Sequence, residues 1–504
     1  MIPAFLSIHL PMTLTPVFGL IFPTLSYIIL GLLALMSLLY VLSFLMRKRP
    51  PVKKDLKDVI VLKKGYDIPI KGAPAGDVQD VKVTRFAIQP KNFRYIFPIP
   101  KLTVAVGDQV QAGDVLFFDR DRPDIKFVSP VSGTVEEILR GAKRSISEVV
   151  IRADETQHYR ALDVVPETAE RARLVAFLAE AGVWPMINQR PYDVIPDFDK
   201  VPRDIFISTF DTAPLAPDGA KLVEGREAAF QKGLDILARL TSGSVHLGLD
   251  GRKDIHPAFA NAKGVKKHYF SGFHPAGNVG IHIHHIAPIR GGEDVVWTLG
   301  VQEVITIGTL FTEGKFDATR IVAIGGNREA SPRYVRTFQG AHIGELLGYS
   351  PAHDVRVISG DVLTGERKTE DEFLNYFDDQ ISVIDEGDYY EMFGWLLPSR
   401  KVPTVSYTYK EGLFPSGKPM DIDANTHGEK RAFVMTGEYE RMLPMDLFPQ
   451  HLMKAILVAD YERMEALGIH ELSEEDIALC EFACTSKQPL QQILRQGLSE
   501  MMSE

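Results

Sequence analysis

The sequence predicts an α+β multidomain protein, on three observations. The 504 residues are 45% hydrophobic and 24% charged, enough to bury several cores, and domains of about 100 to 200 residues would number three or four. Residues 59–151 alternate short strands with tight turns, whereas from residue 166 strands alternate with amphipathic helices. Beyond about residue 366 the chain is acidic and ends in helices. We therefore expect an apolar segment at 1–23, a transmembrane helix at 24–46, a basic linker at 47–58, a β domain at 59–155, an α/β domain at 156–290, an α+β module at 291–365 and a mixed, helical region at 366–504.

The N-terminal segment has the composition of a membrane span. No Lys, Arg, Asp or Glu precedes Arg47, and a helix over the apolar residues 24–46 would be about 35 Å long, enough to cross a bilayer. Six basic residues between Arg47 and Lys57 then predict that the rest of the chain is cytoplasmic. A cleaved signal peptide is disfavoured because no basic residue precedes the apolar run. The alternative is that translation starts near Met46.

The charge and cysteine content exclude several classes of protein. The net charge is −10, and residues 59–504 hold 50 basic and 64 acidic residues, a net −14, so nucleic acid is not an expected partner. Cys480 and Cys484 are the only cysteines, too few for a four-thiolate cluster. Their i, i+4 spacing favours packing on one helical face.

The expected elements follow in chain order. A helix within 166–182 places Leu174, Val175, Phe177 and Leu178 on one face and ends at Gly182. Strands are expected at 205–208, 245–249, 281–287 and 320–326, and helices at 227–240, 295–311, 446–467 and 473–484. Ser473 and Asp476 resemble a capping box at the start of the last helix.

The β domain contains the sharpest motif. The segments 106–118 and 126–138 repeat a half-motif whose glycines form turns, and they resemble a biotinyl or lipoyl carrier domain, a barrel-sandwich hybrid. Carriers present a modifiable lysine at the hairpin tip, but here residues 119–124 read DRDRPD, and Lys126 falls within the next strand. The motif therefore favours a structural role over a carrier function.

A second cluster, Tyr269 to Gly292, contains His274, His282, His284 and His285. On a strand, His282 and His284 would share a face. No Asp, Glu or Cys ligand occurs within the cluster, so a metal site is disfavoured against hydrogen bonding to loop backbone or an interface. The GNVG glycines are a weak nucleotide signal because the complete G-x-G-x-x-G spacing is missing.

Many separated segments resemble the NqrA family, which is one of the subunit families of the Na+-translocating NADH:quinone oxidoreductase. They include SPVSGTV at 129–135, FSGFHPAGNVGIHIHHIAPI at 270–289 and AIGGNREASPRYVRTFQGA at 323–341, and the resemblance covers nearly all of residues 59–504. It implies a barrel-sandwich domain, a β-grasp module of the soluble-ligand-binding kind, a helical C-terminal region and a Rossmann-like α/β domain similar to the flavin subunit of complex I. Residues 1–58 lie outside the resemblance.

The resemblance also implies a role in a respiratory complex that passes electrons from NADH to ubiquinone or menaquinone while exporting Na+. The chain would be one subunit, not catalytic alone, at the cytoplasmic face of the bacterial inner membrane, either peripheral or anchored by one N-terminal helix. Its partners would be the five other subunits, which carry the sites for NADH, FAD, FMN, riboflavin and the iron–sulfur centres. This chain would bind no cofactor and no metal.

Quinone contact is the site hypothesis. We expect His274, His282, His284 and Arg290 to be contact candidates, because imidazole and guanidinium groups can hydrogen-bond a quinone carbonyl. A ligand-free assembly scaffold is the alternative. An electron-transport subunit of the Rnf type is disfavoured by the cysteine count, because that protein carries C-x-x-C-x-x-C motifs.

Overall fold

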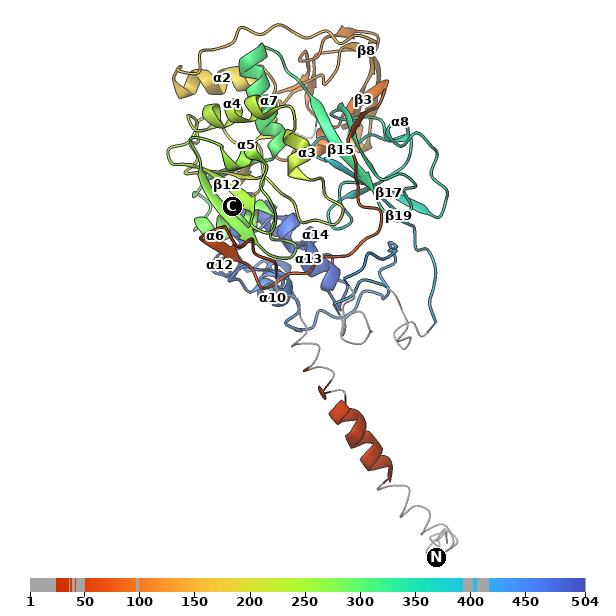
Figure 1. Ribbon diagram of the computed structural model, residues 1–504. Coiled ribbons are helices and arrows are strands. Elements are labelled where there is room, and N and C mark those ends of the chain that lie inside the picture. The colour runs from red at the N-terminus through yellow and green to blue at the C-terminus, as the bar shows by residue number, and fades with distance from the viewer. Residues whose placement is uncertain are drawn as a thin grey trace, which may run out of the picture. The chain divides into compact units, whose positions relative to one another are not determined.

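A computed structural model describes residues 24–35, 37–38, 41, 50–96, 99–392, 402–405 and 417–503 (Figure 1). The chain divides into two compact units, one formed by Met1–Arg49 with Phe393–Gly417 and the other by Pro50–Met392 with Lys418–Glu504. In the first unit, residues 24–35, 37–38 and 41 are helical. None of the helices in the described ranges is long and apolar enough to span a membrane. The other residues of the expected span at 24–46 lie outside the described ones, as do residues 1–23 and 47–49.

The β domain consists of two small sheets that share one core. One sheet has the order β3 (Arg85–Ile88), β9 (Ile146–Ala153), β8 (Gly133–Arg140), β5 (Gln109–Val110), and the other the order β4 (Lys101–Leu102), β6 (Val115–Phe118), β7 (Lys126–Val128). Phe117 and Phe127 stack in the core with ring centroids 4.7 Å apart. Lys126 lies in β7 as expected and forms an ion pair with Glu180 of helix α2 (Arg171–Glu180). The expected structural role of this lysine agrees with that pairing.

The α/β domain is built on a sheet whose central strands are parallel. The sheet order is β1 (Val59–Val61), β13 (Lys266–Ser271), β12 (Val245–Asp250), β11 (Ile205–Ser208), β14 (Val296–Leu299), β10 (Asn188–Arg190), and only β10 is antiparallel to its neighbour. Strand β1 precedes the β domain in sequence but pairs with β13. The second unit therefore starts in the α/β sheet before the chain enters the β domain.

Helices cover both faces of this sheet. Ile205 and Ile207 belong to the large core under α4 (Glu227–Leu237) and α7 (Val301–Glu313), whereas Phe206 packs with Ile283 of α6 (Val279–Ile286) on the other face. This alternation is what a buried strand requires. The two helices α4 and α7 approach so closely that a Cβ atom at Gly233 would collide with the α7 backbone.

Two sequence expectations in this domain are wrong. The expected strand at 281–287 is helix α6, because Val279, Ile283 and Ile286 recur at helical spacing and pack on the sheet. The expected helix at 295–311 begins as strand β14 and becomes α7 only after Gly300. Residues 296–298 of β14 are β-branched or aromatic, which favours a strand, and all four residues of β14 are buried.

A third sheet and a helical region complete the second unit. The sheet order is β18 (Glu366–Lys368), β17 (Val355–Ser359), β19 (Gln380–Asp385), β15 (Thr319–Gly325), β16 (Arg333–Phe338), β2 (Val78–Asp80), with α8 (Ile343–Leu347) after β16. The helical region comprises α10 (Tyr439–Met442), α11 (Pro449–Leu457), α12 (Tyr461–Ala466), α13 (Glu474–Ala483) and α14 (Leu490–Ser503). The expected capping box of Ser473 and Asp476 is confirmed, as is the left-handed Gly182 after α2.

Candidate functional site

A cavity of about 850 Å³ opens at the carboxyl ends of β11 and β14. Counted along the chain from β11, the parallel strands β11 to β14 stand in the order 3-2-1-4. Successive strands are therefore added on one side of β11 and then, with β14, on its other side. In doubly wound sheets ligands bind at this switch point. The cavity is closed by residues from the turn before β19, from the start of α13 and from α14. We therefore take it as the candidate site.

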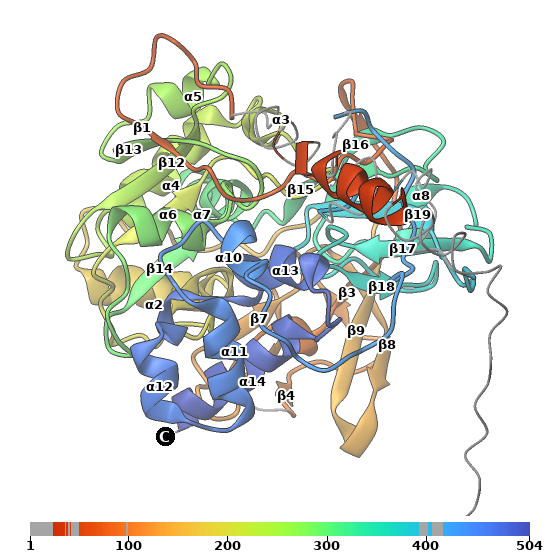
Figure 2. The same ribbon diagram turned by 90° about the horizontal axis from the view of Figure 1, so that it is seen from below.

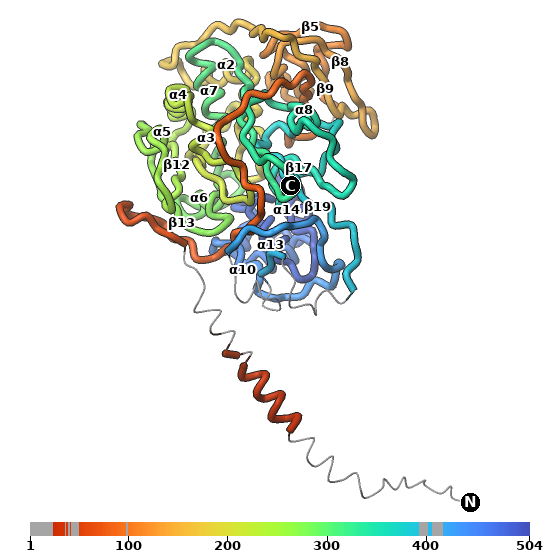
Figure 3. Tube along the Cα trace, turned by 45° about the vertical axis from the view of Figure 1, so that its right-hand side comes forward, coloured from red at the N-terminus to blue at the C-terminus, as the bar shows by residue number. Residues whose placement is uncertain are grey.

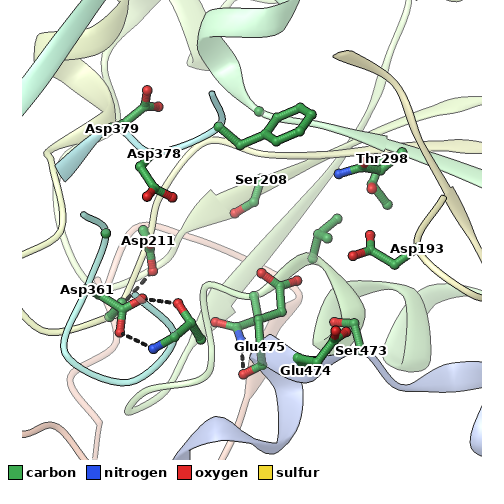
Figure 4. A pocket seen from close by; sticks show the side chains of 18 of the residues that line it. Asp193, Ser208, Asp211, Thr298, Asp361, Asp378, Asp379, Ser473, Glu474 and Glu475 are labelled. Atoms are coloured by element: carbon green, nitrogen blue, oxygen red, sulfur yellow. Dashed lines mark hydrogen bonds between the residues drawn. The ribbon is translucent and has the colours of Figure 1, made fainter. Parts of the chain in front are cut away.

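Carboxylates dominate the lining of the cavity. Figure 4 shows Asp211, Asp361, Asp378 and Asp379 on one side, with Asp193, Glu474 and Glu475 on the other. With Glu303 they make eight acidic lining residues against four cationic ones, namely Lys91, Arg94, Arg190 and Arg495. Each of the four cations already has a carboxylate partner, so the cavity presents negative charge to any ligand.

Burial raises the pKa of Asp211, Asp378 and Asp379. Loss of contact with bulk water raises the pKa of Asp211 and of Asp378 to about 6, and the nearby charge of Asp361 adds to both shifts. Burial likewise raises the pKa of Asp379 to about 7, against the opposing effect of Arg320. Near neutral pH the wall formed by these three groups therefore contains partly protonated carboxyls, which can donate hydrogen bonds.

Two of the helices that begin at the cavity have a carboxylate of the chain at their start. The side chain of Asp218 accepts a hydrogen bond from the first turn of α3 (Gly219–Val223). Glu303 lies at the third position of α7 and curls back over Gly300, while its other oxygen is 2.6 Å from Arg320. A phosphate of NADH, FAD or FMN bound at either of these two helix starts would meet a carboxylate, which is unfavourable.

His274 is the sequence candidate that the structure brings to the cavity. Its side chain is 3% exposed, its Nδ1 lies 3.1 Å from Thr212 Oγ1, and its Nε2 has no hydrogen-bond partner among the described residues. Burial lowers its pKa, so the imidazole is neutral at physiological pH. A neutral ring with one unsatisfied nitrogen can bind a polar group of a ligand.

The other three candidates lie elsewhere. His282 is buried with its Nε2 2.9 Å from Ala276 O and its ring stacked on Phe270. His284 bonds Glu471 through Nδ1 at 2.8 Å and Asp446 N through Nε2 at 3.1 Å. Arg290 is exposed beside the loop that follows α6. The expected common face of His282 and His284 is wrong, because these residues are on a helix.

The C-terminal helices are attached next to the cavity by a buried ion-pair network. Arg190 is 2% exposed and lies 3.2 Å from Asp476 and 2.9 Å from Glu475. Asn278 Nδ2 donates to Glu475 O at 3.0 Å, and a Cβ atom at Gly280 would collide with the Asp476 carboxylate. Gly280 of the GNVG segment therefore allows close approach of α13, whereas Gly277 lies against the backbone of Asp211 and Thr212.

The residues that sequence reasoning missed come from distant segments. Asp211 follows β11, Asp361 follows β17, Asp379 directly precedes β19, and Glu475 lies in the first turn of α13. Only Asp211 had a usable signal, a carboxylate just beyond a buried strand. Within the described residues no group of three His, Cys, Asp or Glu side chains has the arrangement of a metal site. Cys480 and Cys484 are buried, and Cys484 Sγ lies 2.8 Å from the Tyr439 hydroxyl.

Three family profiles match separate parts of the chain. They are described as the NqrA N-terminal barrel-sandwich hybrid domain at residues 60–154, the NqrA second alpha/beta domain at residues 169–316 and the NQRA C-terminal domain at residues 321–370. These matches confirm the barrel-sandwich domain and the α/β domain of the expected fold. They also show that the third domain is of the soluble-ligand-binding type.

Curated relatives match over the same range. The chain is 38% identical over 453 residues to the NqrA protein of the Na(+)-translocating NADH-quinone reductase of Saccharophagus degradans, covering 88% of this chain and all of that protein. It is 36% identical over 452 residues to the NqrA protein of Hahella chejuensis, with the same coverage. A solved NAD+-reducing [NiFe]-hydrogenase chain aligns with 60% of this chain and 55% of its own length at 11% identity and a TM-score of 0.29, too low to indicate a shared fold.

Proposed function

Because the chain belongs to the NqrA family of the Na+-translocating NADH-quinone reductase, we propose that its switch-point cavity contacts the quinone without holding a redox cofactor. The protein is a subunit of a Na+-pumping NADH:quinone reductase and is not catalytic alone. In this proposal it caps the membrane subunits at the cytoplasmic face, and the five other subunits carry NADH, FAD, FMN, riboflavin and the iron–sulfur centres.

The acidic lining of the cavity is the observation that carries the proposal. Eight acidic residues line the space where a related doubly wound domain would hold a nucleotide, and carboxylates lie at the starts of α3 and α7 there. The strand order supports a Rossmann-like domain similar to the flavin subunit of complex I whose nucleotide site has been lost. A quinone head group carries no phosphate, so the lining does not repel it.

His274 ranks first among the four candidate contacts. Its free Nε2 and the partly protonated carboxyls across the cavity supply hydrogen-bonding groups suited to a carbonyl of ubiquinone or menaquinone. His282, His284 and Arg290 remain candidates, but the first two already have hydrogen-bond partners within the chain. We propose that these two mainly hold α6 in place.

The test is His274→Ala in the assembled complex, with His451→Ala as the matched control, because His451 is an exposed histidine on α11 away from the cavity. Loss of one hydrogen bond to a neutral group is worth about 0.5 to 1.5 kcal/mol, so the KM for quinone should rise about two- to tenfold. Recovery of the complex should be unchanged. An unaltered quinone dependence would contradict the site.

The same experiment separates the alternative of a ligand-free assembly scaffold. That function is favoured by the network that joins Arg190 and His284 to the C-terminal helices, since none of those contacts involves a ligand. A scaffold predicts that His274→Ala lowers activity only as far as it lowers recovery of the complex. Quinone contact predicts normal recovery with a changed KM.

A further inference from the structure

The hairpin formed by β8 and β9 carries a cluster of basic residues at its tip. Figure 2 shows the hairpin projecting from the body of the second unit. Arg140, Lys143 and Arg144 are exposed there, and among the described residues none of the three forms an ion pair. Lys143 and Arg144 have φ angles of 54° and 62°, a conformation that turns usually assign to glycine or asparagine.

An apolar groove runs beside this tip. It has a volume of about 790 Å³ and lies between the hairpin and the turn at residues 119–124. Its described lining combines six apolar residues with three cations and includes no acidic side chain; these residues are Ile99, Pro100, Leu102, Phe118, Pro123, Ile146, Lys101, Arg120 and Arg140. The groove and the tip thus form one surface, which we call the hairpin surface.

The hairpin surface contrasts with the charge of the rest of the chain. Residues 59–504 carry a net −14, yet five basic residues gather here: Lys101, Arg120, Arg140, Lys143 and Arg144. Acidic residues near in sequence, Asp119, Asp121, Asp124 and Glu137, do not line the groove. Leu139, next to the tip, is 43% exposed. An apolar groove whose apolar side chains are mostly buried or half-buried, flanked by exposed cations, fits a ligand that is both apolar and acidic.

We propose that the hairpin surface docks an acidic segment with interspersed apolar residues, supplied by another subunit of the complex. An anionic bilayer offers similar charge, but the groove suits the side chains of a polypeptide segment, and crosslinks to lipid alone would identify a bilayer instead. Strand β1, which follows the N-terminal residues of the second unit, lies on the opposite side of that unit from the hairpin in Figures 2 and 3. The hairpin surface therefore lies away from the start of the second unit.

Photo-crosslinking in the complete complex tests the proposal. Benzoylphenylalanine at position 143, in native membranes, should crosslink to a polypeptide segment with more acidic than basic residues and several apolar ones. The matched control is position 263, because Lys263 is also exposed and has no ion pair among the described residues. Crosslinks only to lipid, to a segment without acidic residues, or to no polypeptide would overturn the proposal.

Charge reversal gives an independent readout. The triple variant R140E/K143E/R144E should associate with the remaining subunits about tenfold more slowly than wild type, with a weaker salt dependence. The control variant R239E/K263E/K266E changes three other exposed cations and should associate normally. The proposal would be overturned if both variants associated equally. It would also be overturned if R140E/K143E/R144E associated normally but lost binding to phosphatidylglycerol vesicles. The proposal rests only on membership of the complex, so its failure leaves the quinone site unaffected.

Discussion

The buried Arg190 network should be the strongest attachment of the C-terminal helices. The side chains of Arg190 and Asp476 are 3% and 0% exposed, whereas Glu475 keeps 44% exposure toward the cavity. Burial alone would lower the pKa of Arg190, but the charges of Asp193, Asp476 and Glu475 outweigh it and raise the pKa. Replacing Arg190 with methionine keeps an unbranched apolar stem but leaves the Asp476 charge without its partner.

Breaking a buried pair in this way costs about 3 to 5 kcal/mol. At about 1.4 kcal/mol per factor of ten, Arg190→Met should increase the opening of α13 at least about a hundredfold. Native-state hydrogen exchange of the α13 amides measures this opening directly. The control is Arg463→Met, since Arg463 is 65% exposed and lies 3.6 Å from Asp460, a pair worth under about 1 kcal/mol.

A second substitution isolates the cause. Adding Asp476→Asn to Arg190→Met removes the uncompensated charge while an amide oxygen remains to cap α13, so the double variant should open less often than Arg190→Met alone. If Arg190→Met changed α13 exchange no more than Arg463→Met does, the network would not hold the helices. The reasoning from burial would then be refuted.

Two further predictions concern one residue beside the cavity and one that lines it. Gly280→Ala should loosen α13 by about 1 to 3 kcal/mol because its Cβ atom meets the fixed carboxylate of Asp476, whereas Gly291→Ala, which has open space, should be neutral in the same exchange measurement. Burial raises the pKa of Asp379 from 3.8 to about 7, so the folded state binds this proton more tightly than the unfolded state does. The stability due to this group is therefore complete below about pH 4 and is lost as pH rises through about 7. The thermal unfolding temperature of Asp379→Asn should accordingly rise relative to that of wild type between about pH 5 and about pH 8, the range that spans this titration. A constant difference between the two unfolding temperatures across this range would count against the raised pKa.

Local patterns predicted the elements whose stability is local. Helix α2 and strand β11 followed from apolar spacing and from a single glycine, and the capping box at Ser473 followed from its own two residues. Helix α14 was missed although Leu490, Ile493, Leu494 and Leu498 are buried at helical spacing. That signal was present in the sequence.

The elements that were predicted wrongly depend on tertiary context. IHIHHI alternates like a strand, and only the sheet beneath Ile283 selects the helix. The cavity depends on the packing of two sheets, which brings Asp211 after β11 and Asp361 after β17 together from positions 150 residues apart (361 − 211). Of the four predicted contacts, only His274 lines it, since the cluster is divided between the cavity and the contacts of α6. Short-range spacing holds no information on such an arrangement.

Cofactor content is the most direct test of the central claim that this protein shapes the quinone site without carrying electrons. The full chain should be released from the complex, purified and assayed for flavin and iron, with FMN added to one sample and removed again by dialysis. We expect substoichiometric flavin and iron in both samples, because the acidic cavity repels the phosphate. Stoichiometric flavin or iron that survives dialysis would contradict the account.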